Sequence, residues 1–243
     1  MSERFFLEPP PADGRATLTG DEARHLTRVM RAAVGDSLEL FDGRGGAWQA
    51  EVMRLGRQEV ELAILAEIPA AEPHTATTLT IAAALPKGDR QKWMVEKLTE
   101  LGAARLVPLS TARSVAEATP SALNRLRRQV IEACKQCRRN TLLEIAEPQS
   151  LAEACDSRGA GTLGLLTDPA GPPAGRLLTP PPTSILALIG PEGGFTPEER
   201  QRALDSGFTA IRLGPHILRV ETAAIAIAAV VAAGPSTPGA DVA

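Results

Sequence analysis

The stretch that decides the fold is residues 188–199, which read LIGPEGGFTPEE. An apolar strand ends at Ile189, a glycine-rich turn follows, and Thr196 opens a helix that has proline at its first position. Glycines in such a turn let a ligand come close to backbone N–H groups. The spacing matches neither the Walker A motif nor the dinucleotide fingerprint, so ligand binding and an ordinary tight turn both remain open for this stretch alone.

A second stretch with the same form covers residues 213–224, LGPHILRVETAA. It leaves a strand through a Gly-Pro turn and enters a helix rich in Ala and Ile. Arg219, Glu221 and Thr222 stand where side chains can converge on the carboxyl ends of parallel strands, which is where open α/β sheets bind ligands. A charge pair at a helix start is the plain alternative for Arg219 and Glu221, and Thr222 is expected to cap the helix.

Around these stretches, short apolar strands alternate with helices. The expected strands are residues 79–85, 105–109, 142–145, 162–167, 185–189 and 210–213. The expected helices are residues 90–101, 151–155, 197–206 and 221–233, with a long helix capped by Ser121. Apolar strands alternating with helices indicate an α/β domain with a largely parallel sheet, here residues 73–234. We expect the last residues, 235–243, to be a disordered tail.

The first third of the chain has a different pattern. Strands are expected at residues 34–41, 48–53 and 60–68, and one short helix at 22–30, capped by Thr19 or Asp21. This predicts a small β-barrel domain over residues 1–72, with a linker near residues 69–73.

Charge divides the chain more sharply than hydropathy does. The net charge is −3 over 243 residues, which argues weakly against a nucleic-acid partner, but residues 1–72 carry −5, residues 73–139 carry +7 and residues 140–243 carry −5. The basic helix is expected over residues 124–139. Its cations are Arg125, Arg127, Arg128, Lys135, Arg138 and Arg139. A solvated helix face is the usual meaning of such a run, but here only Glu132 opposes it, which makes a phosphate-binding surface credible. Lys87, Arg90 and Lys92 extend that surface.

Several classes of protein are excluded or disfavoured. The three cysteines cannot all pair and fit a reducing cytosol, and three scattered histidines make a metal site improbable. The longest apolar run has 11 residues, too few to span a bilayer, and the N-terminus lacks an apolar signal segment. We therefore expect a cytoplasmic protein that needs neither a membrane nor a metal.

Five motifs occur in a fixed order along the chain. They are KGDR at 87–90, ELG at 100–102, EACKQC at 132–137, GPEGGF at 190–195 and ILRVETA at 217–223. Together with RFF at 4–6 and the stretch from His25-Leu26 to Gly35-Asp36, they closely resemble the RsmE family of SPOUT methyltransferases. That family methylates N3 of a uridine in bacterial 16S rRNA with S-adenosylmethionine, and the resemblance covers nearly the whole chain.

The resemblance implies a fold and a set of binding residues. The N-terminal domain would be a PUA-like β-barrel that helps to hold RNA. The C-terminal domain would be a SPOUT α/β domain with a trefoil knot, forming a homodimer whose active site lies near the subunit interface. The implied S-adenosylmethionine site comprises Leu166, Thr167, Gly190, Pro191, Glu192, Gly193, Gly194, Leu213, Gly214, Ile217 and Leu218. The RNA-binding residues would be Lys87, Arg90, Arg125, Arg128, Lys135, Arg138 and Arg139.

The resemblance also suggests roles in catalysis. Since the sulfonium already activates the methyl group, the enzyme mainly orients the reactants and manages charge. Arg219 would stabilise the developing uracil anion or position the base, and Glu221 would orient Arg219 or accept the N3 proton. The expected substrate is 16S rRNA within the assembled small subunit. Alternatives are ribose 2′-O methylation by another SPOUT enzyme, a noncatalytic RNA-binding assembly protein, and a small-molecule nucleotide-binding protein.

Overall fold

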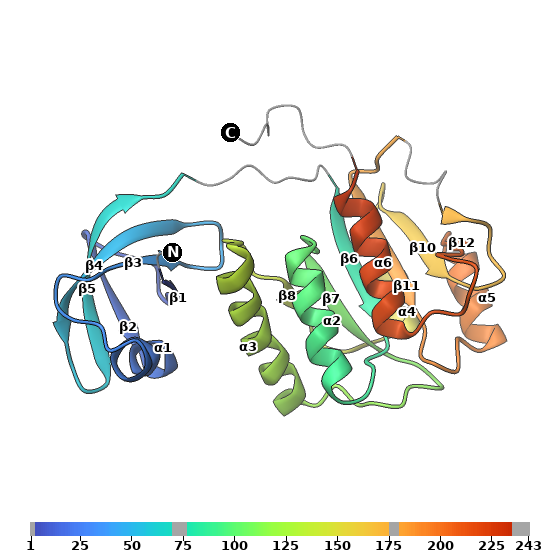
Figure 1. The fold of residues 1–243 in the computed structure, drawn as a ribbon. Coiled ribbons are helices and arrows are strands. Elements are labelled where there is room, and N and C mark those ends of the chain that lie inside the picture. The colour runs from blue at the N-terminus through green and yellow to red at the C-terminus, as the bar shows by residue number, and fades with distance from the viewer. Residues whose placement is uncertain (1–2, 70–76, 175–179, 235–243) are drawn as a thin grey trace. The chain divides into compact units, whose positions relative to one another are not determined.

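The computed structural model describes residues 3–69, 77–174 and 180–234 (Figure 1). The expected tail at 235–243 and most of the expected linker lie outside these residues. The chain forms two compact units, one combining Met1–Ala71 with Ile131–Leu142 and the other combining Glu72–Val130 with Leu143–Ala243. The division falls inside helix α3 (Pro120–Cys137), because the second half of α3 packs with the N-terminal strands.

The N-terminal unit is built on one curled, mixed sheet. Its strands are β1 (Arg4–Phe6), β2 (Arg15–Thr19), β3 (Ser37–Phe41), β4 (Ala47–Leu55) and β5 (Glu59–Glu67), in the order β1-β3-β4-β5-β2. The β1–β3 pair is parallel and the others are antiparallel. Alternating residues such as Leu18, Leu40, Val52 and Leu62 point inward and form the core.

The short helix of this unit differs in detail from the predicted one. A turn of α-helix, α1 (Gly20–Arg24), continues directly into a π-helical turn, η1 (His25–Val29). Thr19 holds the N-cap position but its side chain makes no capping hydrogen bond, and the carboxylate of Asp21 pairs with Arg24. The N-cap residue is therefore Thr19, one of the two predicted, although its side chain does not cap the helix.

Buried charges attach the second half of α3 to this sheet. Arg4 and Glu39 are both buried, and Arg4 Nε lies 2.9 Å from Glu39 Oε1. The other carboxylate oxygen of Glu39, Oε2, accepts a hydrogen bond from Arg138. Lys135 donates to Glu22 in the same unit. Each buried charge thus meets an opposite charge, which offsets the cost of removing it from water.

The second unit contains a seven-stranded sheet in which every pairing is parallel, as predicted. Its strands are β6 (Thr78–Ala83), β7 (Arg105–Ser110), β8 (Glu144–Ile145), β9 (Gln149–Ser150), β10 (Leu163–Thr167), β11 (Ser184–Ile189) and β12 (Thr209–Ile211). The order is β12-β10-β11-β6-β7-β8, and β9 also pairs with β7. Burial on both faces explains the continuous apolar sequences of the central strands.

Helices cover this sheet (Figure 1). They include α2 (Asp89–Glu100), α4 (Leu151–Asp156), α5 (Pro197–Asp205) and α6 (Val220–Ala232). Helix α2 packs against α6, and α6 lies on β6 and β11, whereas α4 and α5 pack against each other and contact β7 and β10.

Two predicted helix caps are wrong and one is confirmed. Helix α3 begins at Pro120, and the Thr119 hydroxyl accepts from the Ala122 N–H at 3.3 Å, so Ser121 lies within the helix. In α6 the N-cap residue is Arg219, which places Thr222 in the first turn without a capping role. Thr196 caps α5 as predicted.

Candidate cofactor and catalytic site

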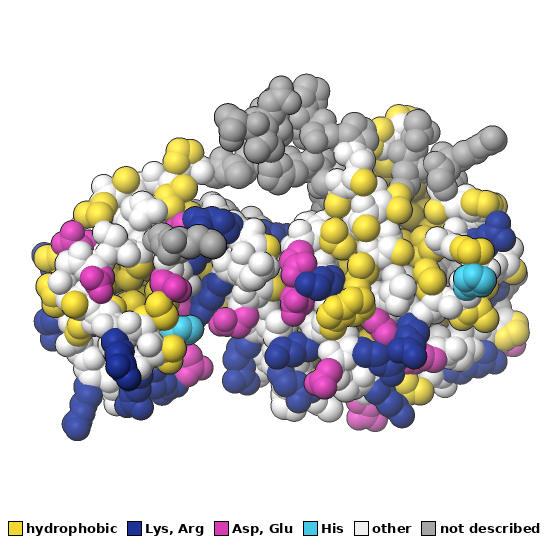
Figure 2. All heavy atoms as spheres, in the orientation of Figure 1, with side chains coloured by type: hydrophobic (Ala, Val, Ile, Leu, Met, Phe, Trp, Pro, Cys, Tyr) yellow, Lys and Arg dark blue, Asp and Glu magenta, His cyan; other side chains and the backbone are white. Residues whose placement is uncertain are grey.

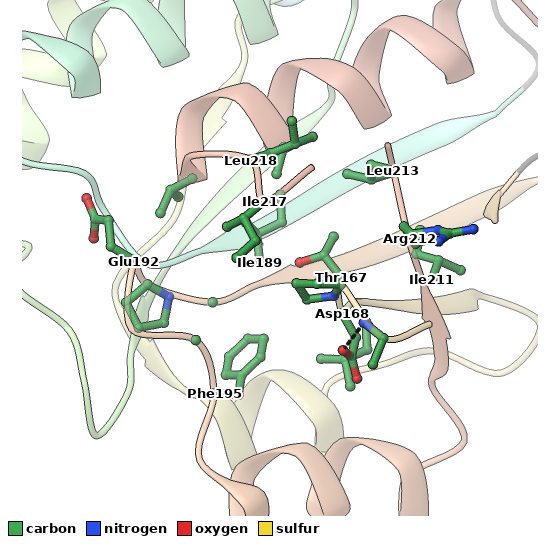
Figure 3. Close-up of a pocket in the computed structure, with 18 of the residues that line it drawn as sticks. Thr167, Asp168, Ile189, Glu192, Phe195, Ile211, Arg212, Leu213, Ile217 and Leu218 are labelled. Atoms are coloured by element: carbon green, nitrogen blue, oxygen red, sulfur yellow. Dashed lines mark hydrogen bonds between the residues drawn. The ribbon is translucent and has the colours of Figure 1, made fainter. Parts of the chain in front are cut away.

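The main cavity of the second unit lies at the carboxyl ends of three neighbouring strands. Strands β12, β10 and β11 are adjacent and parallel, so the loops that follow them meet at one edge of the sheet. These loops enclose a cavity of about 460 Å³ (Figure 3). This is the position at which open parallel sheets bind ligands.

All the residues implied for the cofactor line this one cavity. They are Leu166, Thr167, Gly190, Pro191, Glu192, Gly193, Gly194, Leu213, Gly214, Ile217 and Leu218. Sequence reasoning missed other lining residues, namely Asp168, Pro169, Ala170, Ile189, Phe195, Arg200, Ile211, Arg212, His216, Val220 and Ala223. Several of these directly neighbour an expected residue, but Arg200 lies in α5, and no local signal connects it with the loop after β10.

The glycine-rich turn favours glycine at two positions. Gly194 has φ of +69°, in the left-handed region, and its N–H donates to the Pro191 carbonyl at 2.8 Å. A Cβ added to Gly190 would lie 3.1 Å from a ring carbon of Phe195. The turn therefore holds Phe195 close against the backbone at the floor of the cavity, as Figure 3 shows.

Hydrogen bonds fix this turn from outside the cavity. The Thr196 hydroxyl accepts from the Glu199 N–H at 3.2 Å, and the Glu199 carboxylate accepts from the Thr196 N–H at 2.8 Å, which makes a capping box. The same carboxylate accepts from the Ala112 N–H at 2.8 Å, and Arg113 donates to the Gly193 carbonyl at 2.7 Å. The turn is thus anchored to the segment that follows β7.

The loop after β10 is fixed by polar contacts. The Thr167 hydroxyl donates to the Leu188 carbonyl at 3.1 Å, which ties the end of β10 to β11. Asp168 accepts from Arg200 at 2.6 Å and from the Ala170 N–H at 2.8 Å. Partial burial raises the pKa of Asp168, but these two donors outweigh it, so the net pKa is lowered and the carboxylate stays charged at neutral pH.

The walls of the cavity are mostly apolar. In Figure 3, Ile217 and Leu218 lie on one side and Phe195 on the other, with Thr167 between them. Ile217 is 82% exposed, which is unusual for an isoleucine and places an apolar side chain at the solvent edge of the cavity. An apolar slot with a few fixed polar groups and close backbone is typical of a site for a flat ring such as a purine.

The two proposed catalytic residues flank the cavity and do not line it. Arg219 is exposed at the start of α6, between the lining residues Leu218 and Val220, and no described residue pairs with its guanidinium. Glu221 is only 3% exposed, and its Oε2 meets no hydrogen-bond donor among the described residues.

The cation nearest to Glu221 is Arg90. Arg90 Nη1 lies 3.7 Å from Glu221 Oε1 and also 3.7 Å from Glu192 Oε1. The Arg90 guanidinium thus lies between Glu192, which lines the cavity, and Glu221 in the first turn of α6. The expectation that Glu221 orients Arg219 finds no ion pair to support it.

The candidate RNA-binding cations divide into two groups. Lys87, Arg125 and Arg128 are exposed, and Arg90 is half-buried beside Glu192 and Glu221. Lys135 is paired with Glu22 and Glu132, and Arg138 with Glu39, while burial lowers the pKa of Arg139. The basic run in the sequence is therefore partly neutralised by carboxylates in the fold.

Within the described ranges, no group of three His, Cys, Asp or Glu side chains is arranged to hold a metal ion. None of the helices in the described part of the chain is long and apolar enough to cross a membrane. Cys134 and Cys155 are buried free thiols, and burial raises the pKa of Cys134 to about 12.

Comparison with known proteins agrees with this geometry. A family model described as an RNA methyltransferase domain matches residues 73–232, and one described as an RNA methyltransferase PUA domain matches residues 18–65. A Synechocystis protein named ribosomal RNA small subunit methyltransferase E is 34% identical over 229 residues, covering 92% of this chain and 75% of its own. The Mycobacterium bovis protein of that name is 31% identical, and the match covers 93% of this chain and 90% of the Mycobacterium protein.

Two solved structures are similar over nearly their full length. A putative methyltransferase from Legionella pneumophila, solved with bound SAM, has a TM-score of 0.89 at 28% identity and covers 98% of this chain and 99% of its own. The second is ribosomal RNA small subunit methyltransferase E from Neisseria gonorrhoeae, bound to S-adenosyl methionine. It has a TM-score of 0.86 at 31% identity, and the match covers 95% of this chain and 96% of the Neisseria chain.

Fold and site together define an RNA methyltransferase whose parallel-sheet α/β domain follows a PUA domain. Within that class, the chain belongs to the RsmE family, ribosomal RNA small subunit methyltransferase E. The resemblance found in the sequence motifs is thereby confirmed.

Proposed function

We propose that this protein transfers a methyl group from S-adenosylmethionine to N3 of one uridine in the 16S rRNA of the small ribosomal subunit. The coarser activity, methylation of rRNA with S-adenosylmethionine, follows from membership of the family. The observation that carries the proposal is the cavity at the ends of β10, β11 and β12, which gathers every residue implied for the cofactor.

The cavity suits S-adenosylmethionine in shape and chemistry. Ile189, Leu213 and Leu218 offer apolar surface for the adenine ring, and the glycine-rich turn brings backbone N–H and C=O groups within reach of its edge. Thr167 and the carboxylate of Asp168 add polar groups at the end of β10. When bound, the cofactor supplies an electrophilic methyl group attached to a sulfonium.

Arg219 is the proposed catalytic cation. Uracil N3 carries a proton and is a poor nucleophile until that proton leaves, so negative charge develops on the base during the reaction. The guanidinium of Arg219 is exposed beside the cavity and free of partners within the described residues, so it can turn toward that charge.

Glu221 is the proposed proton acceptor. Its Oε2 has no donor among the described residues, whereas Oε1 lies near Arg90. A carboxylate with one unoccupied oxygen suits proton acceptance better than it suits orienting Arg219. Arg90 is then a positioning residue that holds the first turn of α6 beside the cavity.

The proposed assembly includes a homodimer in the cytoplasm with a C-terminal trefoil knot. Helix α6 is apolar on nearly every side, Val230 on it is 47% exposed, and Trp93 on the adjacent α2 is 46% exposed. Figure 2 shows hydrophobic side chains gathered over α6. A helix that is apolar all round is normally buried, which favours coverage by a second copy of the chain.

Two alternatives make different predictions. Ribose 2′-O methylation would leave the methyl group on the sugar and not on the base. A noncatalytic RNA-binding assembly protein would not need the cavity, so calorimetry would detect no binding of S-adenosylmethionine.

The test is genetic. Mass spectrometry of 16S rRNA from a strain that lacks this protein should show the loss of one N3-methyluridine, and the gene should restore it. Loss of a ribose-methylated nucleoside, or no change in modification, would refute the proposal.

A further inference from the structure

A small cavity lies in the second unit, toward the amino ends of the strands and away from the main cavity at their carboxyl ends. Its volume is about 110 Å³, and the two cavities share no described residue. It is lined by Thr80, Ala82, Arg105, Val107, Gln149, Ala154, Ser157, Arg158, Gly159, Thr162 and Leu186. None of these residues takes part in the site described above.

Three neighbouring strands form one wall of the small cavity. Leu186 of β11 pairs with Thr80 of β6, and Thr80 pairs with Arg105 of β7, so these residues form a row across the sheet. Ala82 and Val107 lie two residues further along their strands, on the same face, and belong with Leu186 to the apolar core. The apolar core of this face therefore gives way to polar side chains at Thr80 and Arg105.

The guanidinium of Arg158 is held in place at the loop between α4 and β10. Its Nη1 donates to the Thr162 carbonyl at 2.7 Å, and its Nη2 donates to the Ser206 carbonyl at 2.9 Å. Its Cζ lies 5.5 Å from the centroid of the Phe208 ring, and a Cβ added to Gly164 would lie 3.1 Å from its Cδ. Carbonyl groups and packing thus fix this cation, and no carboxylate among the described residues pairs with it.

Three buried polar atoms of the lining residues lack a hydrogen-bond partner within the described part of the chain. They are Nε of Arg105, Nε of Arg158 and Oε1 of Gln149. Arg105 Nε lies 3.2 Å from Glu144 Oε1, but not in hydrogen-bonding geometry. Because buried polar atoms are normally hydrogen-bonded, three unpaired atoms around one cavity indicate a ligand that supplies their partners.

The chemistry of these three atoms defines the ligand. The two Nε–H groups are donors on cationic side chains, so an anionic oxygen is their best acceptor. The Gln149 oxygen is an acceptor and needs a donor. At neutral pH sulfate and phosphodiesters offer only acceptor oxygens, whereas inorganic phosphate keeps at least one P–OH group. Inorganic phosphate therefore combines the acceptors and the donor that the cavity needs.

We propose that this cavity binds inorganic phosphate. Its anionic oxygens accept from Arg105 and Arg158, and its hydroxyl group donates to Gln149. The cavity is larger than one water molecule needs and has room for one small tetrahedral anion. Bound phosphate would link β7, β9 and the loop between α4 and β10, and it would balance the charge of Arg158. Since the site forms only in the folded chain, phosphate would stabilise the fold by mass action.

The test measures thermal unfolding in KCl, potassium sulfate and potassium phosphate at neutral pH and equal ionic strength, with calorimetry for the Kd of phosphate. The wild-type Tm should rise with phosphate concentration and much less with sulfate. Gln149→Glu places a carboxylate against the anion, and Arg105→Ala removes one donor. Each variant should bind phosphate about 10- to 100-fold more weakly.

Gln201→Glu is the matched control, because it makes the same charge change at an exposed residue of α5 outside the cavity. It should bind phosphate with the wild-type Kd, and all variants should keep the wild-type Kd for S-adenosylmethionine. A cooperative unfolding transition in KCl shows that each variant is folded, and Arg105→Ala serves if Gln149→Glu is not. A wild-type Tm that does not respond to phosphate, an equal response to sulfate, or phosphate binding that neither Gln149→Glu nor Arg105→Ala weakens would overturn the inference.

Discussion

Arg219 is the residue on which the proposed chemistry depends most. Arg219→Ala should lower kcat by about 10²–10³-fold, the usual effect of removing one group that stabilises a developing anion. The Kd for S-adenosylmethionine should be unchanged, because Arg219 does not line the cavity. Single-turnover methylation of small subunits and calorimetry measure the two quantities.

Thr222→Ala is the matched control for Arg219→Ala. Thr222 is exposed in the same first turn of α6 and caps nothing, so its removal should leave kcat at the wild-type value. Normal turnover by the Arg219→Ala enzyme would remove this residue from the mechanism.

Arg90 acts through charge balance. Arg90→Ala leaves the buried Glu221 without its nearest cation and should lower the free energy of unfolding by about 1–3 kcal/mol, the cost of an unsatisfied buried polar group. Adding Glu221→Gln removes the uncompensated charge, so the double variant should be more stable than Arg90→Ala alone. Thermal unfolding of the two variants measures this coupling, and a double variant less stable than Arg90→Ala would show that the pair carries no such interaction.

At the scale of the element, the start of α5 holds the glycine-rich turn in place. Thr196→Ala should cost about 0.5–2 kcal/mol of stability. It should also weaken S-adenosylmethionine binding, since the capping box fixes the turn that lines the cavity. Calorimetry gives the Kd, and thermal unfolding gives the stability.

Ser150→Ala is a matched control, because Ser150 and Glu153 form the same capping box at α4, outside the cavity. It should lower Tm by a similar amount and leave the Kd unaltered. Equal weakening of cofactor binding by both variants would mean that Thr196 acts through global stability only.

Some elements can be predicted from the sequence and others cannot. The strands of the parallel sheet are buried on both faces, so they appear as apolar runs such as residues 185–189. Strand β1 has only three residues and shows no alternation, and a π-helical turn such as η1 has no pattern distinct from an α-helix. The caps predicted at Ser121 and Thr222 lie two and three residues beyond the observed helix starts, because Thr119 competes with Ser121 at α3 and α6 begins at Arg219 without a hydroxyl cap.

For the site, what could be predicted depends on distance along the chain. Most lining residues lie in three loops marked by glycine or by strand ends, and those signals are local, whereas Arg200 comes from α5 and has no such signal. The partners of Lys135 and Arg138, by contrast, are Glu22 and Glu39, which are 113 and 99 residues away. A charge run is visible in a sequence, but its neutralisation by the fold is not.

At the scale of the whole molecule, the apolar surface of α6 predicts self-association. Val230→Asp places a charge on that surface and should convert the proposed dimer to monomer in sedimentation or light scattering. Val34→Asp, at a 64% exposed valine of the N-terminal unit, is the matched control and should remain dimeric. A wild-type protein that is monomeric at micromolar concentration would exclude the dimer.

The most direct test of the central claim is the chemical identity of the product. Purified protein is incubated with S-adenosylmethionine and small ribosomal subunits from a strain lacking it, and the 16S rRNA is digested and analysed by mass spectrometry. The account predicts one new methyl group per subunit, on N3 of a single uridine. A methyl group on a ribose, or no methyl transfer by protein that binds S-adenosylmethionine, would contradict it.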